Sequence, residues 1–183
     1  VPLLDLVVVS IAADIVPMID ENRVLSFYGL QQLNASPRIG LKSLMNVSNR
    51  KDTFNISDII FGLAPRINAA GRIEHGNKAV ELLVQQDLYL AKEKADHIDS
   101  HNFTRRELDK SITQEALAMI VPDANSTVVY SEKWHKGVVG IVASRLIETH
   151  YRPTIVLTES NGKLTGSARS VSGFDVYNLS LIH

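Results

Sequence analysis

The residues from 87 to 120 include neither glycine nor proline, and their apolar side chains recur at alternating steps of three and four. This spacing predicts one amphipathic α-helix, because residues three and four apart share a helix face. At 1.5 Å per residue the helix would span about 50 Å, which is long for a single globular domain. We therefore expect it to connect two lobes. The alternative is a coiled coil, which the polar Asn102 and Arg105 within the stripe disfavour.

The residues before this helix predict one strand followed by short helices. The aliphatic, β-branched run at 4–12 is typical of a strand buried on both faces of a parallel sheet. Helices are expected at about 21–33, 39–47, 58–64 and 77–84, and Pro65 should end the third of them.

The residues after the long helix predict a small α/β unit. Strands are expected at 127–130, 154–158 and 163–169, with a helix at 138–150 and a tight turn at Asn161 and Gly162. A helix between two strands implies a right-handed crossover and therefore parallel pairing. The fold class is thus α/β in two lobes, divided into residues 1–86, the connecting helix 87–121 and residues 122–183.

Composition limits the function classes. Hydrophobic residues make up 45% and charged residues 21%, as in ordinary globular proteins, and the net charge of −1 disfavours the strongly basic surface of non-specific duplex binders. The absence of cysteine excludes disulfides and thiolate metal sites. No apolar stretch approaches the roughly 20 residues of a membrane span, and no leader is visible, so we expect a cytoplasmic protein without membrane contact. Both chain ends lie within apparent elements, which suggests a piece of a longer protein.

Asp14 is the first candidate site residue. It follows the predicted strand at 4–12, and the carboxyl ends of parallel strands are where open α/β sheets bind ligands. A carboxylate there suits Mg²⁺ or Mn²⁺. The alternative is a turn or helix-cap aspartate, and one carboxylate does not hold a metal by itself.

A second candidate is the segment after Pro65, where Arg66, Asn68 and Arg72 stand among small residues. Small neighbours permit close backbone approach, and arginine offers planar donors that match phosphate. The alternative is a solvated loop with surface arginines, and a solvated face is also what we expect for Arg105 and Arg106 on the long helix.

A third candidate combines Gly137 and the start of the helix at 138–150 with Ser167, Arg169 and Ser170. Glycine lets backbone N–H groups approach an anion, and a helix N-terminus carries partial positive charge. Hydroxyl and guanidinium donors add phosphate ligands. The segment therefore predicts a phosphate site.

His135, just before Gly137, could contact phosphate, orient water or ligate metal; the alternative is a surface-loop histidine. The other five histidines show no obvious metal-ligand spacing, and we expect them in solvent.

Four segments, residues 10–23, 62–74, 134–146 and 166–170, occur in an order that resembles the RecJ-type single-stranded-DNA exonucleases of the DHH phosphoesterase superfamily. The resemblance covers essentially the whole chain. It implies the last metal motif of a DHH domain, a connecting helix and the start of a DHH-associated domain.

The resemblance also implies roles for individual residues. Asp14 would be a ligand of a two-metal Mn²⁺/Mg²⁺ centre, and we assign catalytic roles to Asp14, Arg66 and His135. The residues expected to bind substrate phosphates are Arg66, Asn68, Arg72, His135, Gly137, Ser167, Arg169 and Ser170.

The chain departs from the family pattern in two respects: the Asp-His-His triplet and the other metal ligands have no counterpart here, and neither does the OB-type domain that the family pattern places after the associated domain. We therefore expect the parent to be an exonuclease that degrades single-stranded DNA from the 5′ end in DNA repair and recombination, with a helicase or single-strand-binding protein as possible partner. The piece alone should be inactive. The alternatives are a DHH-type phosphodiesterase for short oligonucleotides or cyclic dinucleotides, and a non-catalytic phosphate- or nucleic-acid-binding module.

Overall fold

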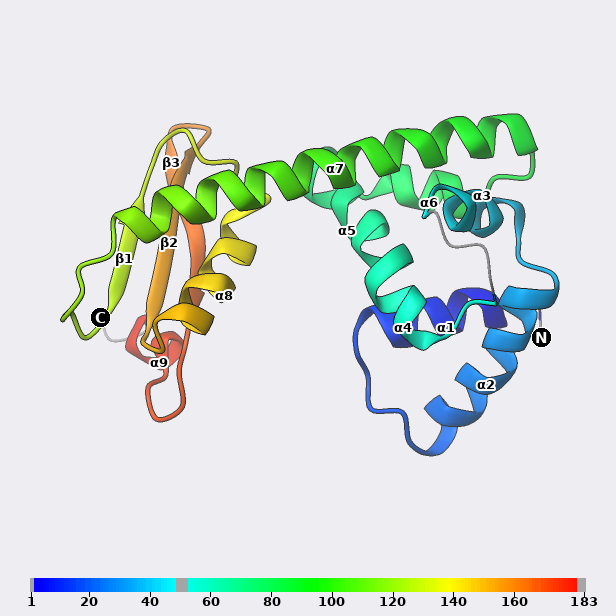
Figure 1. Cartoon of the computed structure of the whole chain (residues 1–183), viewed down its shortest axis with the longest axis horizontal. Coiled ribbons are helices and arrows are strands. Elements are labelled where there is room, and N and C mark those ends of the chain that lie inside the picture. The colour runs from blue at the N-terminus through cyan, green and yellow to red at the C-terminus, as the bar shows by residue number, and fades with distance from the viewer. Residues whose placement is uncertain (1, 49–52, 181–183) are drawn as a thin grey trace. The chain divides into compact units, whose positions relative to one another are not determined.

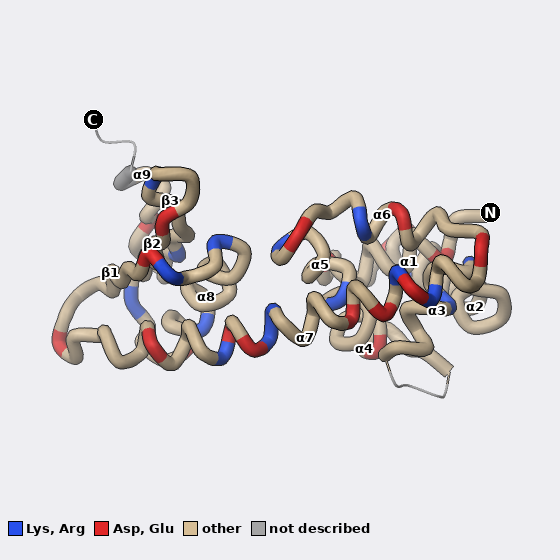
Figure 2. The backbone as a smooth tube through the Cα atoms, turned by 90° about the horizontal axis from the view of Figure 1, so that it is seen from above, with Lys and Arg blue, Asp and Glu red and all other residues tan. Residues whose placement is uncertain are grey.

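The chain forms two compact units. The computed structural model describes residues 2–48 and 53–180 (Figure 1), and the boundary between the units lies between Phe103 and Thr104. The predicted long helix is confirmed as α7 (Leu88–Ala118, 31 residues), which contributes to both units. Along α7, Lys and Arg are interspersed with Asp and Glu (Figure 2). Within the described ranges, no helix is both long and apolar enough to cross a membrane.

The regular elements that the structure describes in the first unit are all helices. Around the start of α7 it packs α1 (Leu4–Ala13), α2 (Asp20–Ala35), α3 (Ile39–Val47), α4 (Ile56–Asp58), the π-helical turn η1 (Ile59–Leu63), α5 (Ala64–Ile73) and α6 (Asn77–Leu83). Its fully buried side chains include Val8, Leu33, Leu41, Leu44, Ile59, Leu63, Leu82 and Ile98.

The predicted strand at 4–12 is wrong, because these residues form helix α1. Of its buried positions, Asp5, Val8, Val9 and Ala12 follow helical spacing, and Ile11 beside them is buried as well. A short apolar run does not by itself distinguish a buried strand from a buried helix. Gly29 of α2 decides the packing, since a Cβ there would lie 2.5 Å from the Leu4 carbonyl oxygen and 2.8 Å from the Val8 Cβ.

The expectation that Pro65 ends a helix is also wrong. Pro65 lies in the first turn of α5, where its missing N–H group costs little, and the wider π-helical turn η1 leads directly into it. The helix before it, α4, is capped by Asn55. The Asn55 Oδ1 accepts from the Asp58 N–H at 3.0 Å, and an Asp58 oxygen accepts from the Asn55 N–H at 2.9 Å. The segment carrying Arg66 is therefore a helix and not a loop.

The second unit confirms the predicted α/β class. It contains β1 (Thr127–Tyr130), α8 (Val139–Thr149), β2 (Thr154–Ser160), β3 (Lys163–Arg169) and the short α9 (Val176–Ser180). The sheet order is β1-β2-β3, with β1 parallel to β2 and β3 antiparallel to it. Asn161 and Gly162 form the predicted turn, with φ angles of 54° and 72°.

Helix α8 covers this sheet with an apolar face. Val139, Val142, Ala143 and Leu146 are buried, and so is Val156 of β2. The four buried residues of α8 lie on one helix face. Their packing against the sheet therefore sets the rotation of α8 about its own axis. This rotation places the other residues of the first helical turn beside β3.

Candidate functional site

Trp134 anchors the loop that leads into α8. Its side chain is buried, and its indole Nε1 donates to Glu115 Oε2 at 2.9 Å. Its carbonyl oxygen accepts from the buried Thr158 hydroxyl at 2.6 Å. Because both the side chain and the backbone of Trp134 are held, the next residues have a defined position at the start of the helix.

His135 follows that anchor and is half-buried. Its Nδ1 accepts a hydrogen bond from the Gly137 N–H at 3.1 Å. In the neutral ring, an accepting Nδ1 leaves the proton on Nε2. His135 is thus prepared to donate from Nε2 to an oxygen atom, which is what a phosphate contact requires.

The N-terminus of α8 lacks a side-chain cap. Its N-cap residue is Val138, whose side chain cannot accept a hydrogen bond, so no side chain competes for the N–H groups of the first turn. Those groups carry the positive end of the helix dipole. In the same turn Gly140 faces β3, where an added Cβ would lie 3.5 Å from Ser167 Oγ and 3.9 Å from Arg169 Nη2.

Arg169, at the end of β3, reaches this turn from the sheet. Its Nε donates to Ser144 Oγ at 3.1 Å, and Nη2 lies 3.4 Å from the Gly140 carbonyl oxygen. Both partners are neutral, and within the described residues no carboxylate forms an ion pair with this exposed guanidinium. Ser167 lies half-buried beside Gly140. The structure thus brings two of the predicted phosphate-binding residues to the first turns of α8.

The Ser170 side chain forms a hydrogen bond to the backbone near its own strand end. Its Oγ accepts a hydrogen bond from the Val176 N–H at 3.1 Å, which closes the turn before α9. Its hydroxyl proton is still available for donation. Ser144 was not among the predicted residues, yet it orients Arg169. The signal that could have found it is its position one helical turn after Gly140, on the same face.

Gly166 explains how β3 lies so close to its neighbour. A Cβ at this position would collide with the Val156 carbonyl oxygen and come within 2.8 Å of the Leu157 side chain on β2. The glycine therefore has a packing function, and it helps to set the position of Ser167 and Arg169, which follow it along β3.

In the first unit, Arg66 is bound by its own surroundings. Nε donates to Asp99 Oδ1 at 2.7 Å, Nη1 to the Gly62 carbonyl at 2.7 Å, and Nη2 to the Val47 carbonyl at 3.3 Å. The Arg66 side chain is 14% exposed. These bonds hold α5 against α3 and α7 within the unit.

Asn68 and Arg72 lie on the same helix, α5, and both are exposed. They are four residues apart, so their side chains leave the helix on one face. Of the predicted site residues on α5, Asn68 and Arg72 are thus exposed, whereas the Arg66 side chain is largely buried.

Asp14 ends α1 as its C-cap residue and is exposed. It therefore follows a helix and not the predicted strand. In the part of the chain that the structure describes, groups of three or more potential metal ligands occur only at Glu74, His97 and His101. Among the described residues, Asp14 is thus not part of such a group.

That group corrects the expectation about the remaining histidines. His97 and His101 are one turn apart on α7, their ring centroids are 4.2 Å apart, and Glu74 lies beside them. His101 is largely buried. Burial and the neighbouring His97 and Lys78 lower the pKa of His101, although Glu74 opposes this shift. The i, i+4 spacing was the signal in the sequence.

A second cationic feature lies within the second unit. Arg105, Arg106 and Lys110 of α7 and Arg145 of α8 line a groove of about 470 Å³. Arg145 forms a two-bond pair with the buried Asp109, at 2.8 and 2.7 Å, which raises the pKa of Arg145. Part of the positive charge in this groove is therefore already neutralised.

Sequence comparison and structure comparison with known proteins give the same result. The family model described as DHHA1 domain matches residues 123–181. The single-stranded-DNA-specific exonuclease RecJ of Bacillus subtilis is 42% identical, over 96% of this chain and 23% of that protein. RecJ of Haemophilus influenzae is 38% identical, over 93% of this chain and 32% of that protein.

The solved structures give the same result. RecJ of Thermus thermophilus in complex with Mg²⁺ matches with a TM-score of 0.86 and 30% identity, over 96% of this chain and 27% of that one. A structure of exonuclease RecJ bound to manganese matches with a TM-score of 0.87 and 31% identity, over 96% of this chain and 44% of that one.

Residues 123–181 are therefore a DHHA1-type domain. The chain is similar to RecJ over nearly all of its length, in sequence and in structure, which confirms the resemblance found in its motifs, and it spans 23% and 32% of the length of the two curated relatives described above.

Proposed function

We propose that this chain is the part of a RecJ-type exonuclease that holds the 5′-terminal phosphate of single-stranded DNA. The observation that carries the proposal is the meeting of Arg169 and Ser167 with the uncapped first turn of α8. His135 adds its Nε2–H at this place, and the Gly137 N–H, which donates to His135 Nδ1, fixes the orientation of that ring.

The donor set suits a terminal phosphate better than an internal one. A phosphomonoester carries a charge of about −1.5 to −2 near neutral pH, whereas a phosphodiester carries only one negative charge. Arg169 supplies a planar guanidinium whose present partners are neutral oxygens. The Ser167 and Ser170 hydroxyls, the His135 Nε2–H and the helix N–H groups add neutral donors. End recognition of this kind favours hydrolysis from the 5′ end.

The contribution of the first unit follows from exposure. With its donors directed at Asp99, Gly62 and Val47, Arg66 acts in this proposal by fixing α5, while exposed Asn68 and Arg72 contact the phosphates of the strand. The two related crystal structures contain Mg²⁺ and manganese, respectively. For this chain we propose only that Asp14 supplies one oxygen ligand. The described residues do not complete such a centre, and we derive no catalytic step through it.

The test uses the chain itself and two oligonucleotides that differ only in a 5′-phosphate or a 5′-hydroxyl group. Fluorescence anisotropy should show tighter binding of the phosphorylated strand. Arg169→Ala should weaken that binding by about ten- to a hundredfold, because a charged hydrogen bond contributes roughly 1.5–3 kcal/mol, and should affect the hydroxyl strand less.

Lys163→Ala is the matched control, since it removes one positive charge from the opposite end of the same strand, β3. It should lower both affinities slightly and equally. Equal losses for both strands after Arg169→Ala would refute the terminal pocket. Strand length separates the alternatives: a preference for dinucleotides over longer strands would indicate a phosphodiesterase for short oligonucleotides. In the longer parent, Asp14→Ala should abolish hydrolysis and leave the fold intact.

The wider proposal is a cytoplasmic exonuclease of DNA repair and recombination, in which this chain provides end recognition and other parts of the protein provide the remaining metal ligands. Mixing the chain with Mn²⁺ alone should then give no hydrolysis of either oligonucleotide. Hydrolysis by the isolated chain would contradict the proposal that other parts of the protein provide the remaining metal ligands.

A further inference from the structure

The cluster of Glu74, His97 and His101 lies entirely within the first unit. His97 and His101 occupy successive turns of α7, and Glu74 is the C-cap residue of α5. One potential ligand atom from each residue lies within 4.8 Å of the other two. Two imidazoles on one helix face and a carboxylate from a second element form a donor set typical of a three-ligand zinc site.

The hydrogen bonding of His101 is incomplete. Its side chain is 15% exposed, and its Nδ1 is buried without a hydrogen-bond partner. Its Nε2 lies 3.7 Å from Glu74 Oε2, which is too long for a hydrogen bond. Two ligands bound tetrahedrally to zinc at 2.0–2.1 Å are about 3.3 Å apart, so the observed gap nearly matches the space that an ion would fill.

Neighbouring charges leave this gap accessible to a cation. Lys78 lies 3.8 Å from Glu74 Oε1, the carboxylate oxygen other than the one nearest His101. This surface pair is 41% and 42% exposed and contributes little to stability, so Lys78 can move away when Glu74 binds an ion. Lys94, the other nearby cation, forms an ion pair with Glu81 at 2.6 Å.

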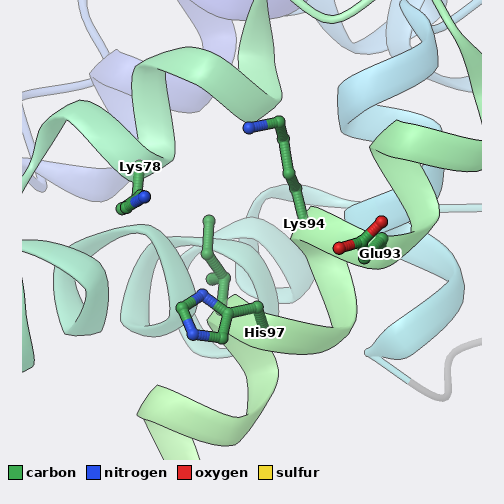
Figure 3. A pocket seen from close by; sticks show the side chains of 5 residues that line it. Lys78, Glu93, Lys94 and His97 are labelled. Atoms are coloured by element: carbon green, nitrogen blue, oxygen red, sulfur yellow. The ribbon is translucent and has the colours of Figure 1, made fainter.

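A pocket of about 480 Å³ opens beside the cluster. His97 lines it together with Lys78, Glu93, Lys94 and Ile98 (Figure 3). An ion held by three protein ligands keeps one coordination position open, and this pocket has room for a water molecule or a small anion at that position.

We propose that Glu74, His97 and His101 bind one Zn²⁺ ion. Imidazole nitrogen selects zinc and related transition metals over Mg²⁺ and Mn²⁺, which prefer oxygen ligands. The site is therefore separate from the oxygen-ligand centre to which Asp14 belongs in our proposed function, and it does not depend on that function. A bound ion would link the end of α5 to α7 and stabilise the first unit.

The test measures Zn²⁺ binding to the tag-free chain by isothermal titration calorimetry, together with the shift in melting temperature. Wild type should bind one Zn²⁺ per chain and melt at a higher temperature in its presence. His97→Gln and His101→Gln should each weaken binding by about tenfold or more, because even outer-shell changes at metal sites cost 10- to 100-fold. Excess Mn²⁺ should not displace the zinc.

His75→Gln is the matched control. His75 is adjacent to Glu74 in the chain, but its Nδ1 accepts from the Asn77 N–H at 3.2 Å and it is not a member of the cluster. This variant should bind zinc as wild type does. Circular dichroism without metal checks that each variant is folded, and exposed His97 gives a variant expected to fold even if His101→Gln does not.

Co²⁺ provides an independent reading, because three protein ligands and one water give the intense visible absorption of a tetrahedral ion. Wild type and His75→Gln should develop this band, and His97→Gln should not. Absence of saturable Zn²⁺ binding in wild type, equal binding by His97→Gln, or an equal loss in His75→Gln would each overturn the proposal.

Discussion

Arg66 and Arg169 both lie in predicted phosphate motifs, but they differ in exposure and in hydrogen-bond partners between the two units. In the first unit Arg66 is 14% exposed and forms three hydrogen bonds, one of them to the Asp99 carboxylate. In the second unit Arg169 is exposed, and among the described residues its hydrogen-bond partners are a serine hydroxyl and a backbone carbonyl. A charge that is already paired has little free energy left for a ligand, so Arg66 stabilises its own unit, whereas recognition by Arg169 is the role that we propose for it.

A second arginine paired with a carboxylate lies elsewhere in the first unit. Asp5 of α1 is 1% exposed and accepts two hydrogen bonds from the Arg38 side chain, at 2.9 and 2.8 Å. Burial raises the pKa of Asp5, but the hydrogen bonds and charge of Arg38 outweigh it and lower the pKa below its usual value. The pair connects the start of α1 to the residue before α3. The comparison between the units can be tested through changes at such residues.

The largest effect is expected for Asp5→Ala, because it leaves the Arg38 charge unpaired at a largely buried site. Loss of one partner from a buried pair costs about 3 kcal/mol or more in the free energy of unfolding. Urea unfolding, with hydrogen exchange to locate the loss in the first unit, measures it. A loss below about 1 kcal/mol would mean that this pair does not hold α1, and would weaken the comparison.

The same pair predicts a pH dependence with a definite sign. Because the folded pKa of Asp5 is lowered, its stabilisation is complete above the unfolded value of about 3.9 and is lost as pH falls through the folded pKa. Asp5→Asn should therefore lose less stability than wild type on acidification through this range. Parallel acid titration curves for the two proteins would contradict the assignment.

A smaller effect is expected for Arg66→Ala. Removing charged hydrogen bonds at a partly buried site should lower the free energy of unfolding of the first unit by about 2 kcal/mol. Arg169→Ala is the matched variant in the second unit, and as an exposed substitution it should change stability by less than about 0.5 kcal/mol. Equal losses for the two variants would show that the contrast between these arginines is not energetic.

A small effect on stability is expected for Gly140→Ala, and it should be favourable. The added methyl group would meet Ser167 at ordinary contact distance, 3.5 Å or more, and alanine in a helix is more stable than glycine by up to about 1 kcal/mol. The methyl group would also fill the space between α8 and Arg169. Binding of the 5′-phosphorylated strand should therefore weaken while the melting temperature rises, and unchanged binding would place the phosphate elsewhere.

The sequence alone was sufficient for most of the second unit and for α7. The bounds of β1 and β3 agree with the predicted ranges, and Asn161 and Gly162 occupy the expected turn. These features depend on local chemistry: a repeat of two or of 3.6 residues, a pair of turn residues able to adopt positive φ, and the absence of glycine and proline from α7. Local signals of this kind do not require knowledge of what the segment packs against.

Only the tertiary structure decided the rest. Residues 4–12 form a helix because Gly29 lets α2 lie directly against them, and Pro65 continues a helix because the π-helical turn precedes it. The partner of Arg66 is Asp99, far along the chain, and Glu74 meets His97 and His101 only after α5 packs near α7. The composition of these segments specifies which side chains can pair. Which pairs form depends on contacts between distant elements. Those contacts pair Arg66 of the first unit with the Asp99 carboxylate and place Arg169 of the second unit beside neutral oxygens.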